Sequence, residues 1–196
     1  MYAHRPDPWQ LADRWYEQRK YALTLAALPE RHYRSAFEPG CSVGVLSGRL
    51  ATRCQALLSC DREETAVAQA RSRLAHLPHV TVQQRVLPGD WPPGRFDLVV
   101  LSELLYYFTA DDSGRLLDLA VASLDPGGTL MLVHWRPEVA EHAQPGDAVH
   151  QQARSHPELV RIAEHTEPDF LLDAFVRSEQ PAAPHRLSVA AAEGLR

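Results

Sequence analysis

Cysteine is scarce in this sequence, and long apolar stretches are missing from it. The three cysteines, Cys41, Cys54 and Cys60, are odd in number, lie in apparent core segments and match no zinc-binding spacing. They favour reduced thiols in the cytoplasm. No stretch approaches the ~18 apolar residues of a membrane-spanning helix, and the amino-terminal residues carry too many charges for a secretory signal peptide. We therefore expect a cytoplasmic protein with no membrane partner and no bound metal.

Positive charge is also in short supply. The 196 residues include 20 basic and 25 acidic side chains, which gives a formal net charge of −5. Because the basic residues form no long run, the sequence does not favour a nucleic acid as partner. The length is enough for one domain with a substantial core and too short for two. We expect one domain over residues 1–178, in a monomer or homodimer, and a disordered tail over 179–196.

Apolar segments that read as buried strands alternate with segments of helical periodicity. Residues 96–101 are nearly all apolar, as in a central parallel strand, whereas 63–74 places its apolar residues on one helix face. This alternation predicts an α/β fold. Residues 159–163 and 170–176 predict a closing β-hairpin, although the first arm also fits a helix. Two further strands are expected to end near Glu38 and Asp61, and two more to cover 80–84 and 129–133. The other expected helices cover 16–28, 45–50, 111–124 and 148–155.

A glycine-marked turn follows the first strand. Gly40 and Gly44 bracket Ser42, and a helix starts at Val45. Glycine allows a positive φ and close approach to a ligand, and the helix start offers free N–H groups. Asp61 closes the second strand about twenty residues later, where a carboxylate accepts hydrogen bonds from a ribose diol. The turn predicts a nucleotide site, the alternative being a turn without a ligand. The missing G-x-G-x-x-G disfavours an NAD-dependent oxidoreductase.

Four motifs carry a resemblance to a known family. The pattern E-x-G-x-S-x-G over 38–44 resembles motif I of the class I S-adenosylmethionine-dependent methyltransferases. Together with D-P-W at 7–9, W-Y-E-Q-R-K at 15–20 and S-E-x-L-Y-Y at 102–107, it resembles the nodulation protein S group. Those enzymes are N-methyltransferases whose type members act on a deacetylated chitooligosaccharide. The similarity extends over about 7–177, and Ser42 departs mildly from the family's middle glycine.

The resemblance implies a fold, a cofactor and a set of cofactor-binding residues. It implies a Rossmann-like class I methyltransferase fold, with a mostly parallel seven-stranded sheet, an antiparallel last strand and helices on both faces. The cofactor would be S-adenosyl-L-methionine and the product S-adenosyl-L-homocysteine. Residues 9–30 would form a lid, and Arg85 stands where the family often has an acidic residue for the adenine. The candidate cofactor-binding residues are Trp9, Tyr16, Lys20, Glu38, Gly40, Ser42, Gly44, Val45, Asp61, Arg62, Arg85, Val86, Ser102 and Tyr106.

Two candidate catalytic residues follow buried strands. His134 lies at a strand's carboxyl end, and its ordinary pKa is near neutrality, so we predict it as general base. The alternative is a histidine that only hydrogen-bonds the loop. Glu103 is predicted to hold and orient an acceptor ammonium, and aromatic side chains there suit cation–π contact. The candidate acceptor-binding residues are Tyr107, Trp135, Arg136 and His150, although one of the two adjacent tyrosines, Tyr106 or Tyr107, also fits a core position.

The predicted function is methyl transfer from S-adenosylmethionine to an amine nitrogen of a small molecule, such as an amino sugar. Two alternatives stay open. One is an O-methyltransferase of the same fold. The other is an S-adenosylmethionine-binding partner protein without activity, which Ser42 and Arg85 support because both depart from the family pattern. The sequence does not name the acceptor.

Overall fold

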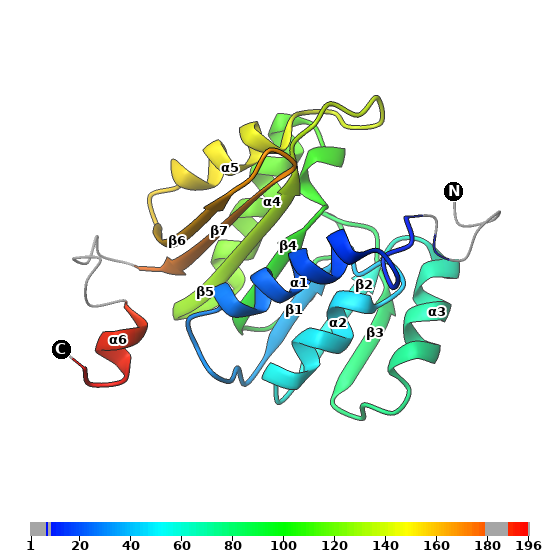
Figure 1. Ribbon diagram of the computed structural model, residues 1–196, viewed down its shortest axis with the longest axis horizontal. Helices are drawn as coiled ribbons and strands as arrows, with labels where there is room; N and C mark the ends of the chain where they lie inside the picture. Colours follow the sequence, from blue (N-terminus) through cyan, green and yellow to red (C-terminus); the bar gives the residue numbers. More distant parts are fainter. Residues whose placement is uncertain (1–6, 8, 179–187, 196) are drawn as a thin grey trace.

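The sheet is the frame of the molecule. A computed structural model describes residues 7, 9–178 and 188–195 (Figure 1). Within these residues seven strands form one sheet in the order β3-β2-β1-β4-β5-β7-β6. The strands are β1 (Ala36–Pro39), β2 (Leu57–Asp61), β3 (Val80–Gln84), β4 (Phe96–Ser102), β5 (Leu124–Trp135), β6 (Leu159–Thr166) and β7 (Phe170–Arg177).

Strand direction brings the functional ends together. The pairs among β3, β2, β1, β4 and β5 are all parallel, and β7 runs antiparallel to both of its neighbours, β5 and β6. The predicted mostly parallel sheet with an antiparallel last strand is confirmed, and so is the closing hairpin. Because parallel strands end at one edge, the residues that follow β1, β2, β4 and β5 meet there.

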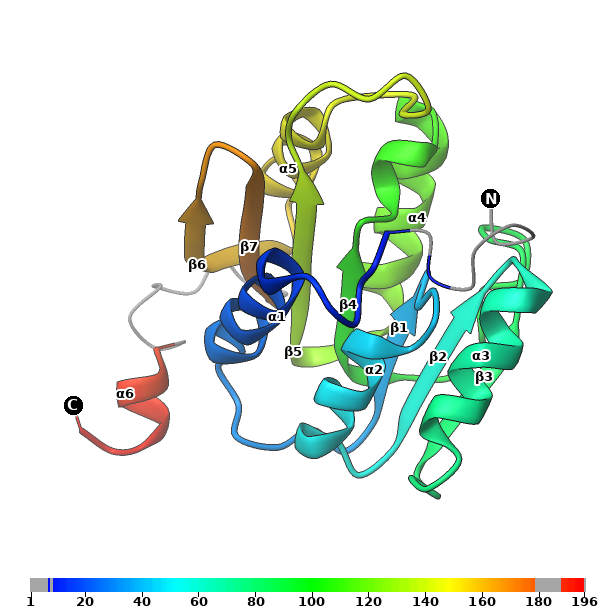
Figure 2. The ribbon, with the colours of Figure 1, turned by 45° about the vertical axis from the view of Figure 1, so that its right-hand side comes forward.

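Helices cover both faces of the sheet, as predicted. Figures 1 and 2 show α1, α2 and α3 on one face and α4 and α5 on the other. The helices are α1 (Trp15–Ala27), α2 (Val45–Leu50), α3 (Glu64–Leu74), α4 (Ala110–Ser123), α5 (Gly146–Arg154) and α6 (Val189–Ala192), with short 3-10 turns η1 (Ala51–Arg53) and η2 (Leu105–Tyr107).

The core divides into two layers across the sheet. On the first face, Tyr21 of α1 and Leu50 of α2 are buried against Val100 of β4 and Met131 of β5. On the second face, the apolar side of α4 packs on alternate residues of the same strands. Since neighbouring residues of a strand point to opposite faces, a central strand must be apolar on both, which is why 96–101 is a continuous apolar run.

A loop covers part of the second face. Between β3 and β4 the chain forms no helix, and Trp91 packs its ring edge against Phe37 with 5.0 Å between ring centroids. Phe96 stacks on the same ring at 5.3 Å. These aromatic contacts bury β1 in place of a crossover helix.

The structure differs from expectation in two places. Residues 125–128, between the helix expected over 111–124 and the strand expected over 129–133, lie within β5, whose pairing with β4 shifts register there, and Gly127 takes φ +80°. Of the predicted disordered tail, 179–187 and 196 lie outside the described residues, whereas 188–195 contains the short helix α6. Residues 1–6 and 8 of the expected domain also lie outside the described residues.

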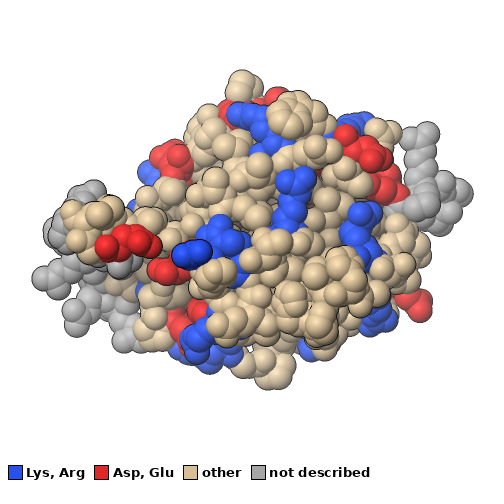
Figure 3. Space-filling model, turned by 60° about the horizontal axis from the view of Figure 1, so that its bottom comes forward, with Lys and Arg blue, Asp and Glu red and all other residues tan. Residues whose placement is uncertain are grey.

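The surface is mixed in charge. On the face in Figure 3, basic and acidic side chains lie among uncharged ones, in several places side by side, and the basic side chains in view form no continuous band. Among the helices of the described residues, none is long and apolar enough to cross a bilayer.

Candidate cofactor and acceptor site

The glycine turn after β1 needs its glycines for two different contacts. Gly40 has φ +74°, and a Cβ there would stand 3.0 Å from Leu104 Cδ1. Gly44 has φ +77° and begins α2, and a Cβ there would stand 3.0 Å from the Cβ of Ala70 on α3. Ser42 between them also takes a positive φ, +50°, which disfavours a side chain. The turn is therefore held in a left-handed path that only small residues follow closely.

Asp61 at the end of β2 is tied to this turn. Its Oδ2 accepts a hydrogen bond from the Ser42 N–H at 2.9 Å, and its Oδ1 accepts one from the Glu63 N–H at 3.0 Å. Each carboxylate oxygen can accept a second hydrogen bond. The pair of oxygens therefore remains able to accept from a ribose diol, while the turn holds the carboxylate in place.

Glu38 sits beneath the turn. It is buried, and the Ser59 hydroxyl donates to its Oε2 at 2.8 Å. Burial raises the pKa of Glu38 to about 7, against the opposing effect of its hydroxyl neighbours. The pKa of this carboxyl, at the carboxyl end of β1, therefore lies near neutral pH.

The residues after β2 and β3 face the surface. Arg85 donates from Nε to Gln83 Oε1 and from Nη1 to the Asp90 carbonyl, each at 2.8 Å. Val86 is 56% exposed, and Arg62 pairs with its neighbour Glu63 at 3.3 Å. The Arg85 guanidinium thus holds the loop after β3.

A compact cluster forms where β4 ends. Glu103 follows Ser102, the buried last residue of β4, and takes φ +52°. Its Oε1 pairs with Lys20 Nζ at 2.6 Å, and its Oε2 accepts from the Tyr106 hydroxyl at 2.5 Å and the Trp135 N–H at 2.9 Å. The strained backbone and the three partners hold this carboxylate in one position.

Lys20, from α1, is the only lysine in the sequence and is 3% exposed. Burial lowers its pKa, but Glu103 and Glu17 outweigh this effect, so its pKa is raised and it stays charged. Glu17 lies 3.0 Å from Lys20 Nζ. The cluster therefore holds two carboxylates against one ammonium.

Aromatic rings line this cluster. Tyr16 meets Trp135 edge to face at 5.6 Å, and Lys20 Nζ lies 5.1 Å from the centroid of the Tyr16 ring. The Tyr16 hydroxyl is buried and has no hydrogen-bond partner within the described part of the chain. Trp9, before α1, is 36% exposed. Tyr16, Lys20, Glu103, Tyr106 and Trp135, chosen from separate motifs, thus meet in one place.

His134 and His150 belong to a buried hydrogen-bonded chain. His134 Nε2 accepts from the Leu105 N–H at 3.2 Å, so its Nδ1 carries the proton and donates to His150 Nε2 at 3.2 Å. His150 Nδ1 in turn donates to Asp173 Oδ2 at 2.7 Å. All three side chains are fully buried, and Arg154 pairs with Asp173 at 2.9 Å.

This chain argues against two predictions. Burial, followed by the charges of His150 and Lys20, lowers the pKa of His134 well below its usual range. Both ring nitrogens of His134 are engaged, so it has no lone pair for an acceptor's proton. His150 is equally enclosed and offers no surface to a substrate. The alternative reading of His134, a histidine that hydrogen-bonds the loop, describes what the structure contains.

The loop 137–145 contacts the cluster after β4 through His142 and Tyr106. Arg136 donates to both Asp147 oxygens, at 3.1 and 3.0 Å, and to the Glu167 carbonyl at 2.7 Å, which closes the loop at its base. Tyr107 is 45% exposed. His142, which sequence reasoning missed, stacks on Tyr106 with 3.7 Å between ring centroids. No local pattern marks His142, because its neighbours come from another segment.

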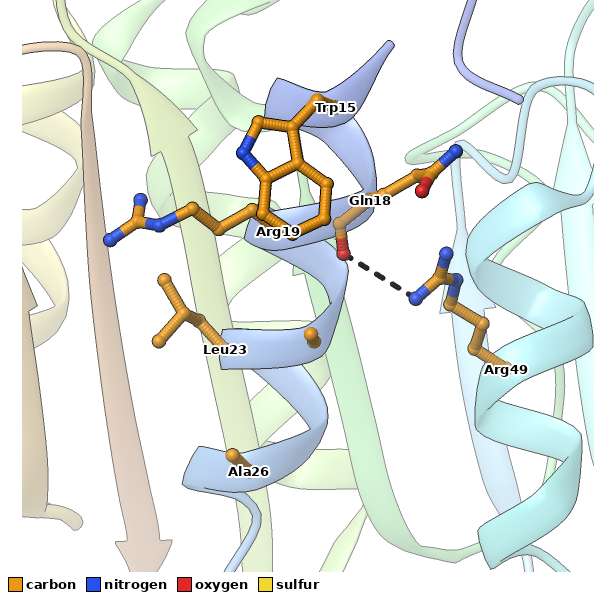
Figure 4. A pocket seen from close by; sticks show the side chains of 7 residues that line it. Trp15, Gln18, Arg19, Leu23, Ala26 and Arg49 are labelled. Carbon is orange, nitrogen blue, oxygen red and sulfur yellow. Dashed lines mark hydrogen bonds between the residues drawn. The ribbon is translucent and has the colours of Figure 1, made fainter. Parts of the chain in front are cut away.

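The predicted lid, residues 9–30, contains α1, and this helix is tied to the rest of the domain. Arg19 binds both oxygens of Glu167, at 2.6 and 2.8 Å, which joins α1 to the turn between β6 and β7. Figure 4 shows a shallow pocket on the outward side of α1, where Trp15 is 73% exposed and Arg49 donates to the Gln18 carbonyl at 3.4 Å. Apart from this pocket, α1 is anchored by the Lys20 pairs and by ring contacts.

The described residues contain no group of three or more histidine, cysteine, aspartate or glutamate side chains arranged to bind a metal.

Solved structures share this fold. A provisionally named methyltransferase from Pseudomonas syringae is 50% identical, with a TM-score of 0.76, over 84% of this chain and all of that one. The N-methyltransferase NodS from Bradyrhizobium japonicum WM9, solved with S-adenosyl-L-homocysteine, has a TM-score of 0.80 at 24% identity, over 88% of this chain and 93% of that one. The fold is therefore the class I methyltransferase fold.

Sequence comparison points to the same family. A nodulation protein S of Rhizobium tropici is 29% identical over 132 residues, which are 64% of this chain and 53% of that protein. This chain thus spans about half the length of that relative. The family model described as Nodulation protein S (NodS) matches residues 3–160, well over half of the sequence. Because that model covers most of the sequence, the chain belongs to the nodulation protein S family.

Proposed function

We propose that this protein transfers a methyl group from S-adenosylmethionine to an amine nitrogen of a small molecule. Family membership and the fold support the methyltransferase part of the proposal. The choice of an amine rests on one observation, the excess of negative charge in the aromatic-lined cluster of Glu17, Lys20 and Glu103.

The residues present fit the cofactor. Asp61 keeps acceptor capacity for ribose hydroxyls, the left-handed turn at Gly40 lets the backbone lie close to a ligand, and Glu38 stands beneath it for the methionine end. When bound, the cofactor supplies an electrophilic methyl group on a sulfonium, whose bond electrons leave with the sulfur. The protein's own tasks are to align the acceptor and exclude water.

The cluster after β4 fits a cationic acceptor. Two carboxylates, the buried Glu17 and the partly buried Glu103, share one ammonium and leave a local negative charge, which a second cation would balance. The Tyr16, Tyr106 and Trp135 rings add faces suited to cation–π contact. Glu103, held by Lys20 and Tyr106, would orient the acceptor ammonium rather than take its proton. An amino sugar, the acceptor class of the resembling enzymes, presents such an ammonium.

Calorimetric titration with S-adenosylhomocysteine tests the cofactor site. We expect wild-type protein to bind and Asp61→Ala to lose about 1–3 kcal/mol, because a buried hydrogen-bond partner is removed. Asp118→Ala is the matched control, since Asp118 is an exposed carboxylate on α4. Absence of binding to the wild type would rule out the methyltransferase proposal, and equal affinity of all three proteins would move the site away from Asp61.

An acceptor screen tests the nitrogen. Wild-type protein, S-adenosylmethionine and a panel of amines, with glucosamine tetramer first, are assayed for S-adenosylhomocysteine release, each beside its hydroxyl analogue. We expect turnover of amines only. Turnover of the hydroxyl compounds instead would favour an O-methyltransferase, and cofactor binding with no turnover of either set would favour a partner protein without activity.

A further inference from the structure

His142 is the histidine placed to meet an acceptor. Its ring lies flat on Tyr106, at 3.7 Å between centroids and 16° between planes, and edge-on to Tyr107 at 5.1 Å. The Tyr106 hydroxyl in turn donates to Glu103. His142 and the carboxylate proposed to hold the acceptor therefore contact the same tyrosine, His142 at the ring face and Glu103 at the hydroxyl.

The loop keeps His142 in this position. The N–H groups of Ala143 and Gln144 both donate to the Tyr106 carbonyl, at 2.8 and 3.3 Å. The Gln144 side chain donates to the Phe108 carbonyl at 3.1 Å. These bonds bind the loop 137–145 to η2, so the stacking is part of a fixed arrangement and not of a free loop tip.

The imidazole of His142 is available for proton transfer. No described residue hydrogen-bonds its ring nitrogens, and the side chain is only partly buried. Partial burial lowers the pKa of His142, and the nearby Glu103 and Glu141 carboxylates oppose that shift, so the ring is neutral at pH 7. His134, edge-on to the Tyr106 ring at 5.3 Å between centroids, and Tyr107, edge-on to His142, are further titratable groups near it.

We propose that His142 accepts the proton that an acceptor ammonium must lose before its nitrogen can be methylated. This inference rests on the proposed amine acceptor. The N–H bond of the ammonium breaks, its electron pair stays on nitrogen as the nucleophilic lone pair, and the proton bonds to a ring nitrogen of His142. Glu103, Glu141 and the Tyr106 ring face stabilise the imidazolium. Because the ring is partly exposed, the proton then passes to water.

The pH dependence of kcat/KM separates a base from a structural side chain. With glucosamine tetramer as acceptor, wild type should stay active at pH 6–7, where the ammonium form dominates. His142→Gln should lose about 100-fold at pH 7, the scale of a lost general base. Its kcat/KM should recover toward wild type as the pH rises to 9, because the free amine then needs no base. His76→Gln, an exposed histidine beyond α3, is the matched control.

Two outcomes would overturn the assignment. A loss for His142→Gln that is equal at all pH values would mean that the ring only shapes the site. Wild-type turnover that His142→Gln leaves unchanged would remove His142 from the reaction while sparing the proposed function. If wild type turns over no amine at all, the proposed function fails, and the role of His142 fails with it.

A second readout does not need turnover. In ¹⁵N imidazole spectra of the S-adenosylhomocysteine complex, the His142 signals, assigned by their loss in His142→Gln, should show a neutral ring at pH 7 that titrates below pH ~6.5. A ring already protonated at pH 7, or one that does not titrate, would contradict the proposal.

Discussion

Histidines occur in two very different settings on the acceptor side of this molecule. In the buried chain of His134, His150 and Asp173, each ring nitrogen has a partner, and the N–H of Leu105 ends the chain at η2. In the open edge, formed by Glu103, Tyr106 and His142, the imidazole is partly exposed and stacks on a ring.

The difference shows that residue type and position after a strand do not make a base. His134 stands at the carboxyl end of β5, where catalytic groups are common, yet burial lowers its pKa and its lone pair is occupied. His142 comes from a loop, is partly exposed, and no described residue hydrogen-bonds its ring nitrogens. We infer that the buried chain holds η2 and that the open edge exchanges protons.

The largest expected effect on stability comes from breaking the buried chain. His150→Phe removes the acceptor of His134 and one donor to Asp173 in a fully enclosed place. We expect urea unfolding to show a loss of about 2–4 kcal/mol, because buried polar groups are left without partners. His76→Phe, at an exposed position beyond α3, is the control and should change stability little. A loss below about 1 kcal/mol for His150→Phe would mean that the chain is not a structural tie.

The next effect concerns the charge cluster. Lys20→Met leaves Glu17 and Glu103 without their counter-charge, and we expect a loss of about 2–3 kcal/mol. Adding Glu103→Gln should restore part of that loss, because the double variant has one uncompensated carboxylate fewer. A double-mutant cycle in urea should therefore give a coupling energy of about 0.5–3 kcal/mol. Strictly additive losses would contradict the pairing.

A smaller effect should appear in acid. Burial raises the pKa of Asp173, but the hydrogen bonds from His150 and Arg154 outweigh burial, so the pKa of Asp173 is lowered. At Glu167, the hydrogen bond from Arg19 lowers the pKa to about 2. Carboxyls with depressed folded pKa values stabilise above their unfolded pKa of ~4 and lose this contribution as pH falls below it.

Urea unfolding at pH 5 and pH 3 measures this loss. Asp173→Asn should reduce the change in unfolding free energy between pH 5 and pH 3 more than Glu167→Gln does, because the Arg19–Glu167 pair is near the surface and screened by solvent. The reverse order would mean that the buried chain is not charged at Asp173.

The smallest stability effect is expected at the open edge. His142→Gln removes one ring stack and no hydrogen bond to the ring, so unfolding should change by about 0.5–1.5 kcal/mol. The same variant is the one expected to change the pH profile most. A loss above ~2 kcal/mol would make His142 structural and would blur the contrast with His150.

Much of the frame could be predicted from local patterns. The apolar run that became β4, the helical spacing of α3 and the glycine turn before α2 each depend on neighbouring residues, and each formed as expected. The expected strand over 129–133 begins earlier instead and includes 125–128, because β5 pairs with β4 on both sides of that segment, at Leu124 and at Thr129. Local patterns do not contain that information.

Contacts between distant segments could not be predicted. Lys20 and Glu103 stand 83 positions apart, and the motifs that contain them do not reveal their 2.6 Å pair. His142 has no periodic or spacing signal, and its role arises only because the loop 137–145 is bonded to Tyr106. The enclosure of His134, which argues against its prediction as general base, could not be foreseen for the same reason, since its burial depends on β5, α5 and β7 together.

The residue order alone determined the α/β class, the nucleotide turn and the resemblance to a methyltransferase family, because these depend on periodicity and on short motifs. Tertiary structure decided which histidine is enclosed and which is open, and which carboxylates share the single lysine. Those properties depend on burial and on hydrogen-bond partners, and both come from packing segments that lie far apart in the chain.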